Sequence, residues 1–279
     1  MVVLVTGANG QLGQSLQFIA KEYPAIEFVF CSSSELDITN KQNCQAVFEK
    51  YQPNYCINSA AYTAVDKAES EPQKAHSINV AGAKNLAEIC KQNDCVLLHI
   101  STDFVFDGSK VTPYTEEDIP NPTGVYGQTK LDGEKAIEET FDKYYIIRTS
   151  WVYSQFGANF MKTMLRLASE RDSLSVVNDQ IGTPTNAVDL AQCLVSIVQS
   201  NNTNFGIYNF SNEGQCSWFD FAKKIFEFHK IKIDLQPIPT SSYPTPAKRP
   251  NYSVLDKGKI KLVFGIDIQN WEDSLKRTP

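Results

Sequence analysis

The chain has few of the residues that build metal sites, disulfide frameworks or membrane anchors. Only three histidines occur, none within ligand spacing of another, so we do not expect a structural zinc site. The seven cysteines contain no C-x-x-C pair and mostly lie among apolar residues, which indicates buried, reduced thiols in a cytoplasmic protein. No apolar run approaches the length of a membrane span, and Met1 leads into an apolar strand without a signal peptide.

An excess of positive charge is also missing. Lysine and arginine total 26 against 32 aspartate and glutamate residues, so the net charge is −6 at pH 7. This balance argues against bulk binding of nucleic acid. The chain of 279 residues has an ordinary globular composition and suffices for one large domain or two smaller ones.

The first thirteen residues combine a buried strand, a glycine-rich turn and the start of a helix. Val2–Val5 form an unbroken apolar row, and Gly7, Gly10 and Gly13 follow at G-x-x-G-x-x-G spacing. Such a turn places backbone N–H groups and a helix dipole against a pyrophosphate. The spacing differs from the commoner G-x-G-x-x-G, so a plain glycine-containing turn is the alternative. The position directly after a buried strand favours a dinucleotide site.

Strand and helix signals alternate through the first half of the chain. We expect further strands at Glu27–Cys31, Tyr55–Asn58, Cys95–Ser101 and Tyr145–Thr149, and helices at Lys41–Tyr51, His76–Gln92 and Tyr126–Glu139. This alternation predicts an α/β fold in which residues 1–150 form a Rossmann-type, doubly wound parallel sheet. The carboxyl ends of such strands share one edge, where ligands bind.

The alternation loosens after Trp151. We expect helices at Asn159–Arg171, Ala187–Gln199 and Ser217–Phe228, the last with Ser217 as N-cap, and short strands at Leu174–Val177 and Gly206–Phe210. Five of the thirteen prolines lie in Pro237–Pro250, which excludes regular helix or central strand there. Residues 151–279 are therefore expected to form a smaller, mainly substrate-binding α/β domain, partly interleaved with the first.

Two short motifs offer chemistry at the expected ligand edge. Tyr126 and Lys130 are one helical turn apart, so the ammonium could stabilise the phenolate and lower the pKa of the tyrosine toward working pH. A surface pair is the alternative. Thr102-Asp103 directly follows the strand at Cys95–Ser101, and a long irregular segment then leads to Tyr126. Thr102 could bond a carbonyl oxygen, and Asp103 could accept from a sugar hydroxyl or act as an acid; a cap or turn pair is the alternative.

Three further segments concern a nucleotide. Asp37 could accept from an adenine amino group with Ile38 packed on the ring, or it could cap the helix near Lys41. The strand at Glu27–Cys31 is followed by Ser32–Ser34, without the acid that contacts a ribose 2′-hydroxyl and without an arginine. We therefore expect NADPH to be accepted at least as well as NADH, without strong discrimination because no arginine would anchor the 2′-phosphate. Lys248-Arg249 could bind a substrate diphosphate or be a solvated basic pair.

Together, the glycine turn after Thr6, Ser101-Thr102, and Tyr126 with Lys130 resemble the extended short-chain dehydrogenase/reductase family. Longer blocks are similar to its dTDP-4-dehydrorhamnose reductase group, and the resemblance covers essentially the whole chain. These blocks are Gly10–Gly13, Asn58–Glu69, Ser101–Gly108 and Arg249–Asn251.

The resemblance implies a role for each matching residue. Tyr126 would be the proton donor, Lys130 would hold the nicotinamide ribose and tune Tyr126, and Thr102 would polarise a C4 carbonyl. The nucleotide-sugar substrate would meet Thr102, Asp103 and Trp151, with Arg249 as the candidate diphosphate contact. The implied cofactor-binding positions are Gly7, Gly10, Gln11, Leu12, Gly13, Asp37, Ile38, Ala60, Ala61, Tyr62, Tyr126 and Lys130. Hydride would pass from NADPH or NADH to C4 of dTDP-4-dehydro-L-rhamnose, giving dTDP-L-rhamnose for cell-surface polysaccharide synthesis.

Departures from the family pattern keep some points open. Phe104 stands where many members have tyrosine. Ser15 stands where some members carry an acidic residue that holds Mg²⁺ at a dimer contact, which puts that metal in doubt and leaves a monomer or a homodimer open. A nucleotide-sugar epimerase or dehydratase of the same fold is one alternative, although a dehydratase needs Asp followed by Glu and Asp103 precedes Phe104. A non-catalytic regulatory subunit is another, and the intact Thr102, Tyr126 and Lys130 argue against it.

Overall fold

Six parallel strands form the central sheet of the computed structural model, which describes residues 1–278. Their order is β10-β5-β4-β3-β1-β2, so the chain reverses direction across the sheet at β1, beside the glycine turn. The expected Rossmann-type sheet is confirmed. The strands are β1 (Val2–Thr6), β2 (Glu27–Cys31), β3 (Tyr55–Asn58), β4 (Val96–Thr102), β5 (Tyr144–Thr149) and β10 (Gly206–Asn209).

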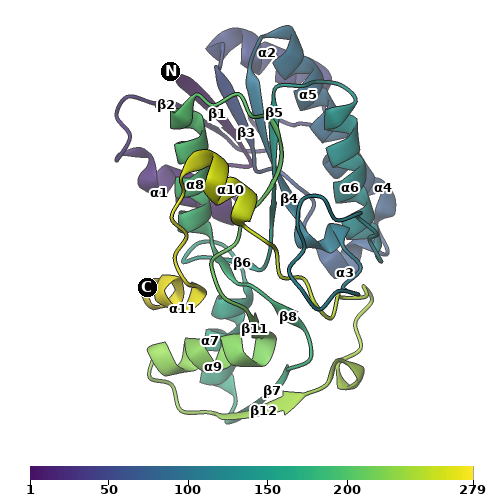
Figure 1. Cartoon of the computed structure of the whole chain (residues 1–279), viewed down its shortest axis with the longest axis vertical. Coiled ribbons are helices and arrows are strands. Elements are labelled where there is room, and N and C mark those ends of the chain that lie inside the picture. Colours follow the sequence, from purple (N-terminus) through teal and green to yellow (C-terminus); the bar gives the residue numbers. More distant parts are fainter. Residues whose placement is uncertain (279) are drawn as a thin grey trace.

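Helices cover both faces of this sheet (Figure 1). Because side chains alternate along a strand, Val3 and Val5 enter the core on one face while Leu4 enters the core on the other. One face packs on α1 (Gln11–Ala20), α8 (Ala187–Ser200) and α10 (Gly258–Phe264). The opposite face packs on α2 (Lys41–Tyr51), α5 (Ala83–Gln92) and α6 (Val125–Glu138).

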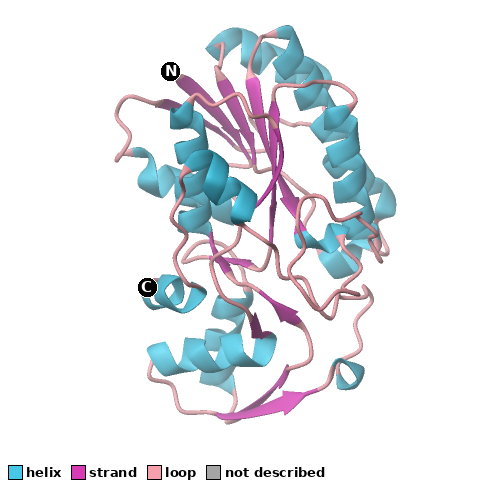
Figure 2. Ribbon diagram, in the orientation of Figure 1, coloured by secondary structure: helices cyan, strands magenta, loops and turns pink. Residues whose placement is uncertain are grey.

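A smaller lobe lies beyond the carboxyl ends of the strands (Figure 2). Its core mixes aromatic and aliphatic side chains and lies around α7 (Phe160–Glu170), α9 (Trp218–Phe228) and α11 (Trp271–Lys276). Three two-stranded ladders complete it: β6 (Val152–Tyr153) with β9 (Thr185–Asn186), β7 (Ser173–Val177) with β12 (Asp234–Ile238), and β8 (Ile181–Gly182) with β11 (Cys216–Ser217).

Helix α9 begins as the sequence predicts, whereas the helix expected at His76–Gln92 does not. Ser217 caps α9 through a capping box with Asp220, as predicted. The helix expected at His76–Gln92 is wrong in its start and its continuity. It begins as α4 (Pro72–His76), passes through a π-helical turn at Ser77–Gly82 and continues as α5. A Cβ at Gly82 would lie 2.7 Å from the Ile38 side chain, so this turn packs closely on the loop after β2.

The expected domain boundary near Trp151 does not separate the two parts of the structure cleanly. Both β10 and α8 come after that residue, yet β10 pairs with β5 and α8 packs on α1. All seven cysteines are free and buried, as expected. No helix within residues 1–278 is long and apolar enough to cross a membrane.

Candidate active site

Helix α6 carries the two residues that the sequence paired as a catalytic motif. Tyr126 and Lys130 lie one turn apart and are almost fully buried where α6 packs on β4. The helix start is held from another segment, because the Glu69 carboxylate accepts from its first N–H at 2.9 Å. At Gly127 a Cβ would lie 2.2 Å from the Phe104 carbonyl oxygen, so glycine permits this close approach to the loop after β4.

The Tyr126 phenol is in its protonated form near neutral pH. Burial, together with the charge of Asp103, raises the pKa of Tyr126 to about 12, although the Thr102 hydroxyl opposes the rise. The expectation that Lys130 lowers this pKa toward neutrality is wrong for this structure, because the ammonium of Lys130 turns to β4 instead. A protonated phenol is the form that can give a proton to a developing alkoxide.

Lys130 lies against the backbone of β4 and one buried imidazole. Its Nζ donates to the Ile100 carbonyl at 2.6 Å and lies 3.1 Å from Nε2 of His99. Burial lowers the pKa of Lys130 to about 8, and the charge of Glu134 opposes this effect. Burial and the charge of Lys130 hold the pKa of His99 well below 6.5, so the imidazole is neutral.

A chain of polar side chains links Lys130 to the glycine turn. His99 Nδ1 lies 2.9 Å from Asn58 Nδ2, and Asn58 Oδ1 accepts from the Thr6 hydroxyl at 2.7 Å. Sequence reasoning gave His99 and Asn58 no role in the site. The available signal was a histidine inside the apolar strand at β4, which requires a buried partner.

Thr102 and Asp103 lie at the end of β4, next to Tyr126. The Thr102 hydroxyl donates to Asp103 Oδ1 at 3.0 Å and accepts from the Phe104 N–H at 3.2 Å, so Thr102 also caps the 3₁₀ turn at 103–105. Burial raises the pKa of Asp103 to about 6, although hydroxyls of Ser253 and Thr102 oppose the rise. The buried Oδ2 of Asp103 has no hydrogen-bond partner within residues 1–278, which is uncommon for a buried carboxylate oxygen.

A buried ion pair lies one turn beyond Lys130 on the same helix. Glu134 and Arg148, from α6 and β5, are 1% and 2% exposed and approach to 2.6 Å, and Ser101 donates to the same carboxylate. Sequence reasoning missed this pair because its members are far apart in the chain.

The glycine turn has the geometry that the sequence predicted. Gly7 has a φ of +66°, and a Cβ there would lie 2.8 Å from the Ala60 nitrogen. A Cβ at Gly13 would lie 2.5 Å from the Gly7 carbonyl oxygen, so α1 packs on the turn after β1 with no room for a side chain. Gly10 is the N-cap of α1 and supplies no side-chain bond, which leaves helix N–H groups available for an anion.

Gln11 and Leu12 have clear structural partners. Gln11 Oε1 accepts from Ser154 and Asn159 at 3.1 and 2.9 Å, which ties α1 to the loop after β6. Leu12 is buried in the core beneath the sheet. At these positions the backbone, rather than the side chain, is suited to meet a cofactor.

The segment after β3 runs beside the glycine turn. Ala60 and Ala61 are partly exposed there. The backbone of Tyr62 is held by Asn79 of the π-helical turn, through bonds of 2.8 and 3.1 Å, and its hydroxyl donates to Glu71 at 2.9 Å. The π-helical turn therefore positions Asn79 to hold the segment after β3, which runs beside the glycine turn.

Asp37 does not cap α2, and its contact with an adenine amino group stays a prediction. The Asp37 carboxylate bonds the N–H and hydroxyl of Thr39, at 2.9 and 2.7 Å, and Asn40 rather than Asp37 caps α2. Asp37 is exposed, whereas Ile38 is buried against Gly82. Ile38 therefore supports the loop and presents little side chain to an adenine ring.

An acidic residue does stand at the end of β2, which corrects our interpretation of Ser32–Ser34. Glu35 turns back on Ser32, and its carboxylate accepts from the Ser32 N–H at 2.8 Å and hydroxyl at 2.7 Å. These bonds lower the pKa of Glu35. The capping spacing S-x-x-E was the signal that sequence reasoning missed.

The remaining substrate candidates lie in the smaller lobe and in the proline-rich segment at 237–250, which we call the strap. Trp151 is partly buried, has a φ of +46° and stacks on Trp218. Arg249 is neither free nor simply solvated. Its guanidinium forms a two-pronged ion pair with Asp66, at 3.0 and 2.8 Å, which joins the strap to the segment after β3.

The residues present do not fit the Mg²⁺ site of some family members. Ser15 is buried and donates to the Gln11 carbonyl at 2.8 Å. Within residues 1–278, no cluster of three or more His, Cys, Asp or Glu side chains could hold a metal ion.

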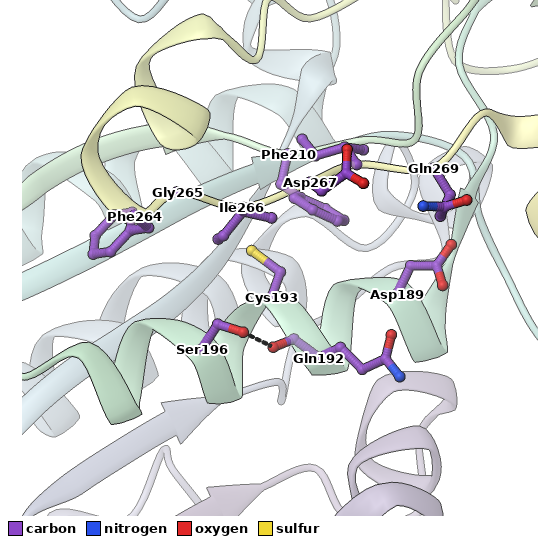
Figure 3. Close-up of a pocket in the computed structure, with 11 residues that line it drawn as sticks. Asp189, Gln192, Cys193, Ser196, Phe210, Phe264, Gly265, Ile266, Asp267 and Gln269 are labelled. Carbon is purple, nitrogen blue, oxygen red and sulfur yellow. Dashed lines mark hydrogen bonds between the residues drawn. The ribbon is translucent and has the colours of Figure 1, made fainter.

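A cavity of about 300 Å³ lies away from these residues (Figure 3). It is bounded by α8 and the segment Phe264–Gln269, and the Ser196 hydroxyl there bonds the Gln192 carbonyl at 2.9 Å. None of the candidate site residues lines this cavity, so we place the chemistry at the carboxyl edge of β4 and not here.

Comparisons with known proteins find relatives that match this chain over nearly its whole length. The family model described as RmlD substrate binding domain matches residues 1–278. A dTDP-4-dehydrorhamnose reductase from Aggregatibacter actinomycetemcomitans is 44% identical, over 98% of this chain and 97% of that protein. The crystal structure of such a reductase from Clostridium acetobutylicum has a TM-score of 0.96 at 43% identity, covering 100% of this chain and 98% of that one. The Bacillus anthracis reductase in complex with NADP has a TM-score of 0.94 at 40% identity, covering 99% and 98%.

The burial of Asp103 predicts a pH-dependent cost in stability. Between its ordinary pKa of 3.8 and its raised value of about 6, the unfolded chain releases a proton that the folded protein retains, so stability falls as the pH rises. Asp103→Asn should therefore be more stable than the wild type by about 2–3 kcal/mol at pH 7. Urea unfolding at pH 4 and pH 7 measures this, and an equal gap at both pH values would contradict it.

Proposed function

The chain belongs to the dTDP-4-dehydrorhamnose reductase family, and we propose that it reduces the C4 ketone of dTDP-4-dehydro-L-rhamnose to dTDP-L-rhamnose with NADPH or NADH. The observation that carries this proposal is the convergence of Thr102, Tyr126 and Lys130 at the carboxyl edge of β4, beside a glycine turn suited to a dinucleotide.

The residues present fit a nicotinamide dinucleotide. Its phosphates would meet backbone groups at the N-terminus of α1, at the turn of Gly7 and Gly10, and at the neighbouring Ala60. Lys130 would hold the nicotinamide ribose. The bound cofactor supplies the hydride. The free, buried thiols support a cytoplasmic location. The enzyme would act as a monomer or as a homodimer.

The side chains then account for the proton. Thr102 would turn its hydroxyl from Asp103 to the ketone oxygen, and the protonated Tyr126 beside it would give its proton to that oxygen as the C4 alkoxide develops. Lys130 is held against β4 by the Ile100 carbonyl and His99, and from there it would hold the nicotinamide ribose beside Tyr126. Asp103 offers its unpartnered Oδ2 to a sugar hydroxyl.

Turnover of reduced cofactor tests the proposal. The enzyme should consume NADPH when mixed with dTDP-4-dehydro-L-rhamnose, and much less with other nucleotide 4-keto-6-deoxy sugars. An epimerase or dehydratase of this fold would convert the sugar without net loss of NADPH, and a regulatory subunit would leave both unchanged. Either result would overturn the proposal.

Loss of the phenolic proton should remove the chemical step. Tyr126→Phe should lower kcat by about two to four decades, since a positioned acid contributes that much. KM for the nucleotide-sugar should change little, because the ring remains. Steady-state kinetics measures both, and a variant within a few-fold of the wild-type kcat would sink the assignment.

The carboxylate at the end of β2 should bias cofactor choice. The Glu35 carboxylate accepts from the Ser32 N–H and hydroxyl, which are the donors that a 2′-phosphate would use. It is also negatively charged, as the phosphate is. Glu35→Gln should raise the ratio of kcat/KM for NADPH to that for NADH by about three- to tenfold. Glu22→Gln, which changes an exposed residue just after α1, should leave the ratio unchanged. An unchanged ratio in the Glu35 variant would contradict the idea.

The ion pair of Arg249 with Asp66 allows the diphosphate hypothesis to be tested against a structural one. If Arg249 binds the diphosphate, Arg249→Ala should raise KM for the nucleotide-sugar about ten- to a hundredfold, with a small effect on KM for NADPH. Asp66→Asn frees the guanidinium and should not raise that KM. Equal losses in both variants would show that the pair only fastens the strap.

A further inference from the structure

The indole of Trp151 is enclosed on one face by a second tryptophan. The rings of Trp151 and Trp218 stack with centroids 3.5 Å apart and planes 9° apart, and Phe160 lies against Trp218 at 4.6 Å. Trp218 is the first residue of α9 and lies far from Trp151 in the chain. The proposed function gives Trp218 no role.

The backbone of Gly182 covers the other face. A Cβ at Gly182 would lie 2.5, 2.6 and 2.8 Å from Cε2, Cζ2 and Nε1 of Trp151, distances that place it above the ring plane and not beside its edge. If this Cβ lay on the face that stacks with Trp218, it would be closer to Trp218 than to Trp151. Its three nearest neighbours are all Trp151 atoms, so it lies on the opposite face. The Trp151 ring is therefore held between Trp218 and Gly182.

The backbone around this stack fixes all three residues. Gly182 pairs with Cys216 in the β8–β11 ladder, and Ser217 then caps the helix that begins with Trp218. The Trp151 carbonyl accepts from the Thr185 N–H at 3.2 Å. Trp151 keeps a left-handed φ of +46°, a conformation that costs free energy in a residue with a side chain and is characteristic of functional sites.

With both faces covered, the ring can offer a ligand only its edge. Within residues 1–278 the Nε1–H of Trp151 has no hydrogen-bond partner, and its nitrogen is not fully buried. The N–H therefore reaches the surface. Trp151 follows β5 two residues after Thr149, which pairs with Thr102 at the edge where we place the sugar.

We infer that Trp218 is a positioning residue: with Gly182 it holds the Trp151 indole edge-on, so that Trp151 gives the substrate sugar an N–H donor and not an aromatic face. This inference rests on the proposed reduction of a nucleotide-linked ketosugar. The donor selects for an oxygen acceptor on the sugar, whereas an open aromatic face would select for its apolar C–H groups.

Kinetics of four variants test the role of Trp218. Trp151→Phe removes the N–H and should raise KM for the nucleotide-sugar about three- to tenfold, with KM for NADPH within twofold of the wild type. Trp218→Leu removes the stacking partner and should raise the same KM by a similar factor. Trp218→Phe keeps an aromatic face and should remain within about twofold of the wild type.

The double variant separates positioning from a general structural effect. If Trp218 acts through the Trp151 N–H, Trp218→Leu should add less than twofold to KM once Trp151 is Phe. Additive losses, equal changes in KM for NADPH, or a wild-type KM for Trp218→Leu would overturn the inference. Wild-type turnover of NADPH is measured in the same assay, so failure of the proposed function is seen separately.

A measurement on the wild-type protein is independent of how the variants fold. The chain has three tryptophans, so ¹⁵N-labelled indoles give three N–H signals in an NMR spectrum, and Trp151→Phe identifies one of them. Saturating dTDP-L-rhamnose should move the Trp151 signal downfield, as expected for a new hydrogen bond, whereas dTDP alone should not. No shift with the sugar, or the same shift with dTDP, would refute an N–H contact to the sugar.

Discussion

The buried ion pair between Glu134 and Arg148 constrains the position of everything in the site. Two charges that are almost completely removed from water must meet in good geometry, because leaving one unpaired costs about 3–5 kcal/mol. Glu134 lies on α6, one turn after Lys130 and two turns after Tyr126, and Arg148 lies on β5. The pair therefore fixes how far α6 can slide or rotate on the sheet, and with it the place of the phenol.

The other buried polar groups depend on that placement. Lys130 reaches His99 and the Ile100 carbonyl only because α6 lies against β4, and the line from His99 through Asn58 to Thr6 then ties the helix to the glycine turn. Two polar side chains at the carboxyl edge of β4 are buried at a cost in stability. Asp103 has an oxygen without a hydrogen-bond partner, and burial raises the pKa of Tyr126. Such groups lower stability and are retained where a ligand completes them.

Local patterns carried much of the fold and the motifs, because strand alternation, the glycine turn, the Tyr126–Lys130 spacing and the Ser217 cap are set by neighbouring residues. What the sequence did not reveal depends on contacts between distant segments. Examples are β10 joining β5, the partners of Arg148 and His99, the pairing of Arg249 with Asp66, and the enclosure of Trp151 by Trp218. The predicted effect of Lys130 on Tyr126 failed for the same reason: helical spacing does not show that a longer side chain finds better partners on a strand.

The proposed reduction requires direct transfer of hydride from the cofactor to C4 of a sugar bound beside Tyr126. The most direct measurement uses NADPH deuterated at either C4 position of the nicotinamide, with dTDP-4-dehydro-L-rhamnose and the wild-type enzyme, and locates the label by NMR and mass spectrometry. We expect one of the two labelled cofactors to deliver a single deuterium to C4 of dTDP-L-rhamnose. A converted sugar without deuterium from either cofactor, or deuterium at another carbon, would contradict the account.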